Sequence, residues 1–415
     1  MKEDNIIEIA KKIENIGGKL YLVGGAIRDK YLKRKVTDED YCVTGINQAD
    51  FEKLFPKAII RGKDFPVYDI QGKEIALARE ERKLDKGHKS FIINTNKNIT
   101  IEQDLARRDI TINSIAQEVL TEKIIDPFNG IEDIKNKTIR KTTEAFREDP
   151  LRAYRVARFA ATLEFKVEKN TIESMYELKE ELNTLSGERV FDEFRKALLS
   201  NKPSIFFEVL KEANILDVHF REIYNLIGKT QPEKYHPEGD SFNHTMIVLD
   251  NSSKLTNNLE VKFSCLVHDL GKGTTPKEIL PHHYGHEERG IELVQSLGKR
   301  IKIPNNWIKC GKAACKFHMK GGIFEQMTTK KQVDFIENVS KTILGLEGMK
   351  IIVMCDKSRN GEFVEVNFDK IGKEVLKKVT GKDIIKKYNI TNGKEIKNRL
   401  RQERIKLLND MKKQK

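Results

Sequence analysis

The chain has few of the residues that mark secreted or membrane proteins. It contains five cysteines, one tryptophan and ten prolines among 415 residues. The cysteines are odd in number and lie mostly inside apolar runs, which excludes a disulfide scaffold and favours buried, reduced thiols. Cys310 and Cys315 lack the spacing of a zinc knuckle. No apolar run reaches the length of a membrane span, and Met1–Glu14 is too charged for a signal peptide. We therefore expect a cytoplasmic protein.

Negative charge is in deficit. The chain has 76 Lys and Arg residues against 63 Asp and Glu residues, a net charge of +13. Such an excess is typical of proteins that bind a polyanion such as nucleic acid, although solvated lysine-rich helix faces would produce it too. The length predicts two to four domains. We place their boundaries at residues 1–140, 141–227, 228–342 and 343–415.

Short apolar runs alternate with turn signals in the first hundred residues. A helix is expected at 4–16 and another at 26–32, and the basic stretch Lys83 to Ser90 is interpreted as a mobile loop. Strands are expected at 19–23, 40–43, 58–60, 67–70 and 74–78. From about Ile101 the apolar spacing is helical throughout, with a Pro-containing linker at 228–240. The Lys/Arg-rich end forms either a basic helix or a frayed tail.

Two glycines and two aspartates lie within 20 residues of the first expected strand. Gly24-Gly25 follows the strand and allows the backbone to approach a phosphate, and Arg28 lies in the helical turn that follows. Asp38 and Asp40 are two residues apart at a strand start, so both point to one face, where such a pair binds two Mg²⁺ ions. Glu39 points to the other face. Each motif alone is better explained by a tight turn or a solvated strand end, whereas their combination within 20 residues is far more specific.

Glu74, on a later strand, is the candidate for a third carboxylate at this metal site. An exposed strand glutamate is an equally good interpretation of that residue.

At this point the chain resembles a family, the bacterial class II tRNA nucleotidyltransferases, and within it the multifunctional CCA proteins that carry an HD domain. Seven motifs carry the resemblance over most of the chain, in the family's order. They are Leu22-Val-Gly-Gly-Ala-Ile-Arg-Asp29 with Asp38-Glu-Asp40, Phe65-Pro-Val67, Ala76-Leu-Ala-Arg79, Leu105-Ala-Arg-Arg-Asp-Ile-Thr-Ile-Asn113, Asp126-Pro-Phe-Asn-Gly130, Glu148-Asp-Pro-Leu-Arg152 and Arg155-Val-Ala-Arg158.

The resemblance implies an α/β nucleotidyltransferase head, a mixed sheet with helices, followed by a mostly α-helical neck, body and HD domain. It implies Mg²⁺-dependent addition of CCA to tRNA from CTP and ATP without a template, by a monomer or homodimer. Asp149 and Arg152 would read the base, which suits cytosine and adenine because both offer an amino donor beside a ring acceptor. The remaining nucleotide contacts implied by the resemblance are Gly25, Arg28, Arg108, Asp109 (for the ribose), Arg155 and Arg158. The loop at residues 83–90 would serve the switch from C to A addition.

Eight of the nine histidines lie between His219 and His318. His268-Asp269-Leu-Gly-Lys272 resembles the motif of HD phosphohydrolases, in which His and Asp bind a metal together. The resemblance implies phosphatase and 2′,3′-cyclic phosphodiesterase activities with Ni²⁺ or Mg²⁺. Histidines bonded to backbone carbonyls are the plainer alternative. The expected metal ligands are His244, His268, Asp269, His283, His286 and Asp356.

Two features depart from that pattern: Met319 follows His318 where some relatives have Asp, and a basic run follows Asp356. Three other functions were weighed. A poly(A) polymerase shares the head but normally lacks the histidine-rich domain, and an alarmone synthetase–hydrolase carries its HD domain first. An inactive RNA-binding module would not need both aspartates. The basic segment from Lys394 to Lys415 either follows tRNA phosphates or lies in solvent.

Overall fold

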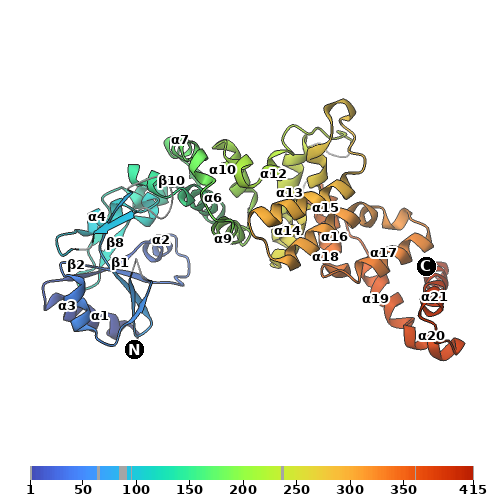
Figure 1. The fold of residues 1–415 in the computed structure, drawn as a ribbon, viewed down its shortest axis with the longest axis horizontal. Coiled ribbons are helices and arrows are strands. Elements are labelled where there is room, and N and C mark those ends of the chain that lie inside the picture. Colours follow the sequence, from blue (N-terminus) through green and yellow to red (C-terminus); the bar gives the residue numbers. More distant parts are fainter. Residues whose placement is uncertain are drawn as a thin grey trace. The chain divides into compact units, whose positions relative to one another are not determined.

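The computed structural model describes residues 2–62, 66–83, 91–94, 96–234, 238–359 and 361–414. The chain divides into two compact units. The first comprises Met1–Arg189 and Ile205–Ile215, and the second comprises Val190–Ser204 and Leu216–Lys415 (Figure 1). The four-domain division expected from the sequence is finer than this one and stays a prediction.

The first unit is built on a mixed sheet whose described strands run in the order β3-β4-β5-β2-β1-β8-β9. β2 pairs parallel with β5, and the other neighbours pair antiparallel. A separate hairpin joins β6 and β7. The strands are β1 Lys19–Val23, β2 Asp40–Thr44, β3 Ile59–Arg61, β4 Val67–Ile70, β5 Lys73–Leu77, β6 Glu80–Lys83, β7 Phe91–Asn94, β8 Ala116–Glu118 and β9 Ile124–Ile125.

Short helices surround this sheet. They are α1 Lys2–Glu14, α2 Gly25–Tyr31, α3 Gln48–Leu54, α4 Ile101–Ala106, η1 Thr111–Asn113 and α5 Gly130–Lys135. α1 packs against both β1 and α3, with Ile9 and Ile13 buried (Figure 1). α4 begins at a capping box, in which Thr100 and Gln103 bond each other's backbone. The central strands β1 and β2 are buried after their first residue, as their continuous apolar runs require.

A helical segment completes the first unit. Its elements are β10 Thr138–Ile139, η2 Glu144–Glu148, α6 Leu151–Leu163, β11 Lys166–Val167, α7 Lys169–Glu177, α8 Lys179–Leu182, the start of α9 (Gly187–Ala197) and α10 Ser204–Glu212. The α6 residues Ala153, Val156 and Ala157 are completely buried, so this helix forms the centre of the segment.

The second unit consists of helices. They are α11 Leu216–His219, α12 Arg221–Tyr224, α13 Ser241–Leu255, α14 Leu259–Val267, η3 Leu270–Thr274, η4 Lys277–Ile279, α15 His286–Arg300, α16 Asn305–Gly322, η5 Phe324–Gln326, α17 Thr329–Val339, α18 Gly345–Asp356, α19 Phe368–Lys378, α20 Gly381–Tyr388 and α21 Gly393–Lys413. α14 contacts α13, α16 and α18 and is almost wholly buried. Its buried Lys262 donates to the Leu198 carbonyl at 2.9 Å, so this central position leaves that ammonium with a partner.

The expected fold class is confirmed, and each strand and helix expected before residue 100 is present. One expectation is wrong: the chain is not helical throughout after Ile101, because β8 and β9 extend the head sheet beyond β1. Strands of two or three residues are too short to display a period of two in the sequence. Phe65 and residues 84–90 of the expected loop lie outside the described residues.

The basic C-terminal end is a helix rather than a frayed tail. α21 buries Leu408 against Val333 and Val375, which lie on α17 and α19. Arg401 pairs with Asp334 through two hydrogen bonds of 2.6 and 2.8 Å. The sparse apolar positions of this segment are therefore the ones that dock it.

Candidate functional site

The carboxylates expected to hold metal lie at one edge of the head sheet. Asp40 opens β2 and is in register with Glu74 on the parallel strand β5, so the two residues share a face. Asp38 lies two residues before Asp40, and all three are exposed and line one cleft. Glu39 also lines this cleft, but its carboxylate accepts from the Tyr41 hydroxyl at 3.1 Å and pairs with Lys73.

Acidic side chains gather around Asp40. Partial burial and the carboxylates of Glu74 and Asp38 raise the pKa of Asp40, whereas Arg108 opposes the rise. Arg61 neutralises part of this charge, since its guanidinium lies 3.2 Å from Glu74 and 2.8 Å from Asp69. Closely spaced acidic groups of this kind match the oxygen donors that Mg²⁺ prefers.

The glycine pair after β1 brings an arginine close to the backbone. Gly24 has a φ of 72°, and a Cβ there would lie 2.9 Å from a guanidinium nitrogen of Arg108. Arg108 is also held by the buried Asp104 at 3.2 Å. Gly24 is therefore needed both for its left-handed conformation and for this close approach.

The base-reading pair is arranged differently from what the sequence predicts. Asp149 is not on a helix with Arg152, because η2 ends at Glu148 and α6 begins at Leu151. Pro150 explains the break, since proline disfavours helical backbone in the residue before it. Asp149 instead accepts from the Leu151 amide at 3.0 Å and from Arg189 at 3.1 Å. Arg152 is buried and donates to the Ala145 carbonyl at 2.5 Å.

The buried Asp109 pairs with Arg155 of α6, whose side chain is partly exposed. Arg155 donates to Asp109 through Nε and Nη2, both at 2.7 Å. The other oxygen of Asp109 accepts from Asn113 at 3.1 Å. Burial opposes the ionisation of Asp109, yet Arg155 and Asn113 hold its pKa well below its usual range. The ribose reader implied by the resemblance is thus an ionised carboxylate whose oxygens orient other side chains.

A single ring gathers three of the arginines assigned to the nucleotide. The guanidinium carbons of Arg28, Arg155 and Arg158 lie 5.2, 5.6 and 3.8 Å from the ring centroid of Phe159. These distances are within the range of cation–π contacts. Arg28 is further fixed by Asn113, whose side-chain oxygen lies 2.6 Å from its Nη1. Phe159 was not identified from the sequence, where it looks like any core residue of a helix.

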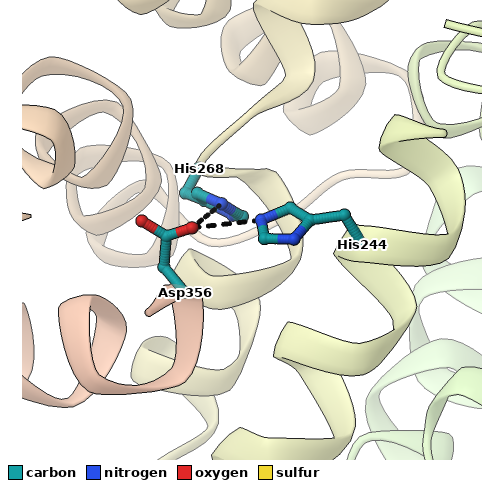
Figure 2. Close-up of side chains that lie close together, drawn as sticks. All are labelled: His244, His268 and Asp356. Atoms are coloured by element: carbon teal, nitrogen blue, oxygen red, sulfur yellow. Dashed lines mark hydrogen bonds and ion pairs between the residues drawn. The ribbon is translucent and has the colours of Figure 1, made fainter. Parts of the chain in front are cut away.

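The second unit brings two histidines and an aspartate from three helices to one centre. His244 lies on α13, His268 at the end of α14 and Asp356 at the end of α18 (Figure 2). The Asp356 Oδ1 atom lies 3.0 Å from His244 Nε2 and 3.7 Å from His268 Nε2. These residues form one of two groups of three possible ligands, with donor atoms within 4.8 Å of one another, found among the described residues.

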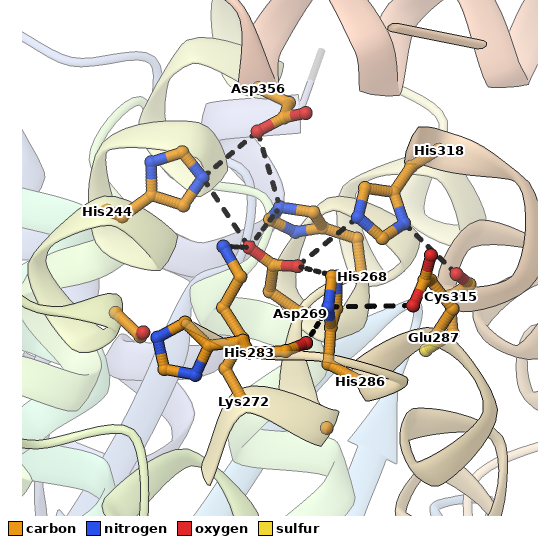
Figure 3. Close-up of polar contacts among 12 residues, drawn as sticks. His244, His268, Asp269, Lys272, His283, His286, Glu287, Cys315, His318 and Asp356 are labelled. Atoms are coloured by element: carbon orange, nitrogen blue, oxygen red, sulfur yellow. Dashed lines mark hydrogen bonds and ion pairs between the residues drawn. The ribbon is translucent and has the colours of Figure 1, made fainter. Parts of the chain in front are cut away.

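Asp269 occupies the middle of the cluster (Figure 3). Its Oδ1 lies 3.2 Å from the Nε2 atoms of both His286 and His318. Its Oδ2 lies 3.3 Å from His268 Nε2 and 2.5 Å from the Lys272 ammonium. One carboxylate thus links two halves of the donor set, and His268, Asp269 and His318 form the second group of three.

The histidines are oriented by their other ring nitrogens. The Nδ1 atoms of His268, His286 and His318 lie 2.8 to 2.9 Å from the backbone carbonyls of Cys265, His283 and Ala314. The Nδ1 atom of His244 lies 2.6 Å from Glu238. This arrangement fixes the ring orientation and turns each Nε2 inward. The sequence offered histidine–carbonyl contacts as an alternative to metal binding. In the structure these contacts occur at Nδ1 while Nε2 remains directed toward the cluster, so the two interpretations are compatible.

The donor set fits a divalent ion. Four buried atoms lie near one another but make no well-directed hydrogen bond: Asp269 Oδ1 and the Nε2 atoms of His268, His286 and His318. Orphaned buried groups are costly, so their convergence indicates a missing partner. Burial disfavours a charged His268, yet Asp269 raises its pKa to about 10. A bound dication would take the place of that proton.

The sequence predicts His283 as a metal ligand and does not predict His318. The structure places His318, rather than His283, in the donor set. The ring nitrogens of His283 lie 2.8 Å from Thr275 Oγ1 and 3.0 Å from the Thr230 carbonyl. The structure therefore does not bring the His283 ring into the donor set. His318, on α16, was not proposed as a ligand but lies at its centre. Its position within the histidine-rich segment was the available signal.

Gly271 of the His-Asp-Leu-Gly-Lys motif has a packing role. A Cβ there would lie 1.9 Å from the backbone oxygen of His286. Only glycine allows η3 to contact the start of α15 this closely. The motif glycine thus helps to bring His286 to Asp269.

Comparisons with known proteins match both units of the chain. The family models that match are the Poly A polymerase head domain over residues 20–140, the probable RNA and SrmB-binding site of polymerase A over 164–226, and the HD domain over 241–333. The multifunctional CCA protein of Pseudoalteromonas atlantica is 40% identical over 401 residues, which cover 93% of this chain and 98% of that protein. The chain belongs to the multifunctional CCA protein family.

A second member of the multifunctional CCA family, from Mannheimia succiniciproducens, is 46% identical over 310 residues, covering 72% of this chain and 73% of its own. The fold is shared more widely. A CCA-adding enzyme in apo form II has a TM-score of 0.67 at 20% identity, covering 98% and 91% of the two chains. The Thermotoga maritima CCA-adding enzyme complexed with tRNA has a TM-score of 0.65 at 18% identity, covering 97% and 90%. Among the described residues, no helix is long and apolar enough to cross a membrane.

Proposed function

We propose that the protein adds the 3′-terminal CCA to tRNA from CTP and ATP without a nucleic-acid template. The observation that carries the proposal is the cleft formed by Asp38, Asp40 and Glu74 in a head domain of the polymerase type. Near-complete alignment with a relative named multifunctional CCA protein supports the choice of substrate.

The carboxylate cleft is assigned to Mg²⁺. Bound in pairs, such ions activate the attacking hydroxyl and stabilise the leaving pyrophosphate. Asp38 and Asp40 hold them, and Glu74 joins by giving up its contact with Arg61. The raised pKa of Asp40 supports this assignment, because a cation relieves the repulsion among the three carboxylates.

Nucleotide selection is assigned to Asp149 and Arg152. A carboxylate accepts from the exocyclic amino group of cytosine or adenine, and a guanidinium donates to the neighbouring ring nitrogen. Uracil and guanine present the opposite pattern and would leave both side chains unpaired. In this structure the two side chains bond Arg189 and the Ala145 carbonyl, so a base is read in exchange for those contacts.

The phosphates are assigned to arginines that face Phe159 and the Gly24 turn. Arg28, Arg108, Arg155 and Arg158 supply this charge, with Gly25 beside them. We assign Asp109 to the ribose and to the orientation of Arg155, because one of its oxygens is already paired with that residue.

We assign tRNA binding to contacts with the charged phosphate backbone rather than to recognition of the base sequence. Residues 368–415 contain sixteen Lys and Arg against six Asp and Glu, which makes ten of the thirteen net positive charges. Lys394, Lys397 and Lys406 are exposed on the docked helix α21. A rigid, basic surface of this kind binds phosphates with strong dependence on salt.

A second activity, metal-dependent phosphate-ester hydrolysis, is assigned to the histidine cluster. A divalent ion bound there, such as Ni²⁺ or Mg²⁺, polarises the phosphate and lowers the pKa of a bound water. The ligands proposed are His244, His268, Asp269, His286, His318 and Asp356, with Asp269 shared between the two halves. Two measurements test this assignment. They are the metal content of the purified protein and its rate of hydrolysis of 2′,3′-cyclic AMP.

Timed incorporation of CTP and ATP on a tRNA that ends before CCA tests the main proposal. We expect two cytidines and one adenosine to be added, followed by a stop. Continued adenosine addition would instead identify a poly(A) polymerase. A tRNA already ending in CCA serves as the control and should accept nothing.

A further inference from the structure

A pocket opens beside the histidine cluster, and its lining joins two kinds of residue. His244 and Asp356, both proposed metal ligands, form its more buried lining. Ile247 and Arg359 also line it and are exposed, with 45% of Ile247 accessible. The pocket therefore connects the metal centre with solvent between α13 and the segment that follows α18.

The segment that carries Arg359 is held in place by its backbone. The Arg359 amide donates to the Glu362 carbonyl at 3.0 Å, and the Glu362 amide donates back at 2.8 Å. Ser358 anchors the segment from the other side, because its buried hydroxyl accepts from Asn251 of α13 at 2.6 Å. The start of the Arg359 side chain is thus positioned before any ligand arrives, which lowers the entropic cost of binding.

The pocket is lined by both acidic side chains and an arginine. Glu238 and Asp356 contribute carboxylates to its lining, and both contact His244. Carboxylates repel a phosphate, so a phosphate bound in this pocket needs a cation beside it. Arg359 is the one permanently charged cation among the lining residues that the structure describes. A guanidinium also matches two phosphate oxygens at once.

We propose that Arg359 binds the phosphate oxygens of the ester that this site hydrolyses, and that Ile247 packs against its nucleoside. The inference rests on the phosphohydrolase function proposed above and names the residues that give that site its substrate class. Ile247 supplies an exposed apolar surface on α13, one turn after His244, as a base or ribose requires. Arg359 acts in binding, so it governs substrate affinity rather than metal affinity.

The test compares Arg359→Gln with Lys357→Gln in the full-length, Ni²⁺-loaded protein. Lys357 is a matched control, because it lies two residues away and donates to the Gly322 carbonyl at 2.7 Å instead of lining the pocket. Binding of inorganic phosphate is measured by calorimetry, and hydrolysis of 2′,3′-cyclic AMP by steady-state kinetics. For Arg359→Gln we expect the phosphate Kd and the KM to rise by about tenfold to a hundredfold, as for the loss of a charged hydrogen bond. Nickel content, kcat and CCA addition should stay unchanged.

A second variant separates the nucleoside contact from the phosphate contact. Ile247→Ser should raise the KM for 2′,3′-cyclic AMP by about fivefold through lost apolar contact, with the phosphate Kd unchanged. Equal rises in both quantities would overturn the role of Ile247.

The outcomes distinguish this inference from the function on which it rests. The protein could bind phosphate through Arg359 and yet hydrolyse no ester. That result would support the anion site and contradict the proposed phosphohydrolase activity. If hydrolysis occurs with a KM and phosphate Kd that match those of Lys357→Gln, the anion site is overturned and the phosphohydrolase stands.

Discussion

The head cleft and the histidine cluster both present ligands for a divalent ion, but they differ in how far they are assembled. Asp38, Asp40 and Glu74 are exposed, and one of them is occupied by an arginine. His268 and Asp269 are 0% and 1% exposed, and His268 Nε2 and Asp269 Oδ1 make no well-directed hydrogen bond. The head carboxylates lie at an exposed cleft, whereas the cluster holds its possible ligands together among buried side chains.

The largest effect expected from this contrast is the loss of nucleotide addition on neutralising one head carboxylate. Asp40→Asn should lower CTP and ATP incorporation by more than about a thousandfold, beyond the loss typical of one transition-state hydrogen bond. Because the carboxylates are exposed, stability should hardly change. The measurement is timed incorporation on tRNA lacking CCA.

Glu39→Gln is the matched control for Asp40→Asn, since that neighbouring carboxylate faces Tyr41 and Lys73. It should retain most of the addition activity. Incorporation by Asp40→Asn near the level of Glu39→Gln would remove Asp40 from the metal site. Hydrolysis of 2′,3′-cyclic AMP should be equal in both variants.

The next largest effect concerns the cluster. His268→Ala should lower bound nickel and ester hydrolysis by about a hundredfold or more, since even residues outside the first ligand shell cost up to that much. CCA addition should persist. His283→Ala is the control, because its ring bonds Thr275 and Thr230 rather than the centre. We assign His268 to the donor set and leave His283 out of it. An equal fall in nickel content in the two variants would contradict that distinction.

The sequence predicted the two sites unequally for physical reasons. Strand periodicity and the Asp38-Glu-Asp40 spacing are local, so the strands and the face of each carboxylate were predictable. Ligands contributed by separate helices are not local, and the choice between His283 and His286 depended on where the chain turns at Gly285, which has a φ of 68°. His318 reaches the centre from α16, and no spacing rule connects it to His268.

The error at Asp149 has a similar origin. A helical period extends smoothly across Pro150, yet the proline removes Asp149 from the helix, and Arg189 from α9 then holds it. Partners that come from distant segments, such as Arg189 and Asn113, leave no pattern near the residue they contact. Motif resemblance recovered the function because it substitutes for that missing long-range information.

A third prediction asks whether burial alone explains the cluster. His219, in the same unit, is 6% exposed and lies near the cation Arg300, whereas His268 lies beside the carboxylate of Asp269. Burial and the nearby Arg300 lower the pKa of His219 to about 4, whereas Asp269 raises that of His268 to about 10. Carboxylates, rather than burial, therefore set the charge of the cluster histidines.

The sign of the resulting pH dependence follows from linkage. The folded pKa of His219 lies below its unfolded value of about 6.5, so its contribution to stability is complete above pH 6.5 and is lost as pH falls toward 4. Lowering the pH from 6.5 to 5 should cost roughly 2 kcal/mol in the wild type, at 1.36 kcal/mol per pKa unit. This loss should be absent in His219→Gln.

Urea unfolding followed by the fluorescence of Trp307, the one tryptophan of the chain, measures the stability of this unit. Trp307 is buried against Phe191 and Phe263, so its emission reports local packing. Parallel acid slopes in wild type and His219→Gln would show that other groups carry the pH dependence.

The smallest effect distinguishes the head once more from the cluster. The head's arginines are gathered by the ring of Phe159, not by a buried shell of carboxylates alone. Phe159→Leu keeps an apolar side chain but removes the ring quadrupole, so the KM for CTP and ATP should rise together by about tenfold, with kcat little changed. Phe159→Tyr retains an aromatic ring and should restore the KM values for both CTP and ATP. A rise for one nucleotide only would mean that the ring acts in base selection, and the shared phosphate arginines would then need another explanation for their common orientation.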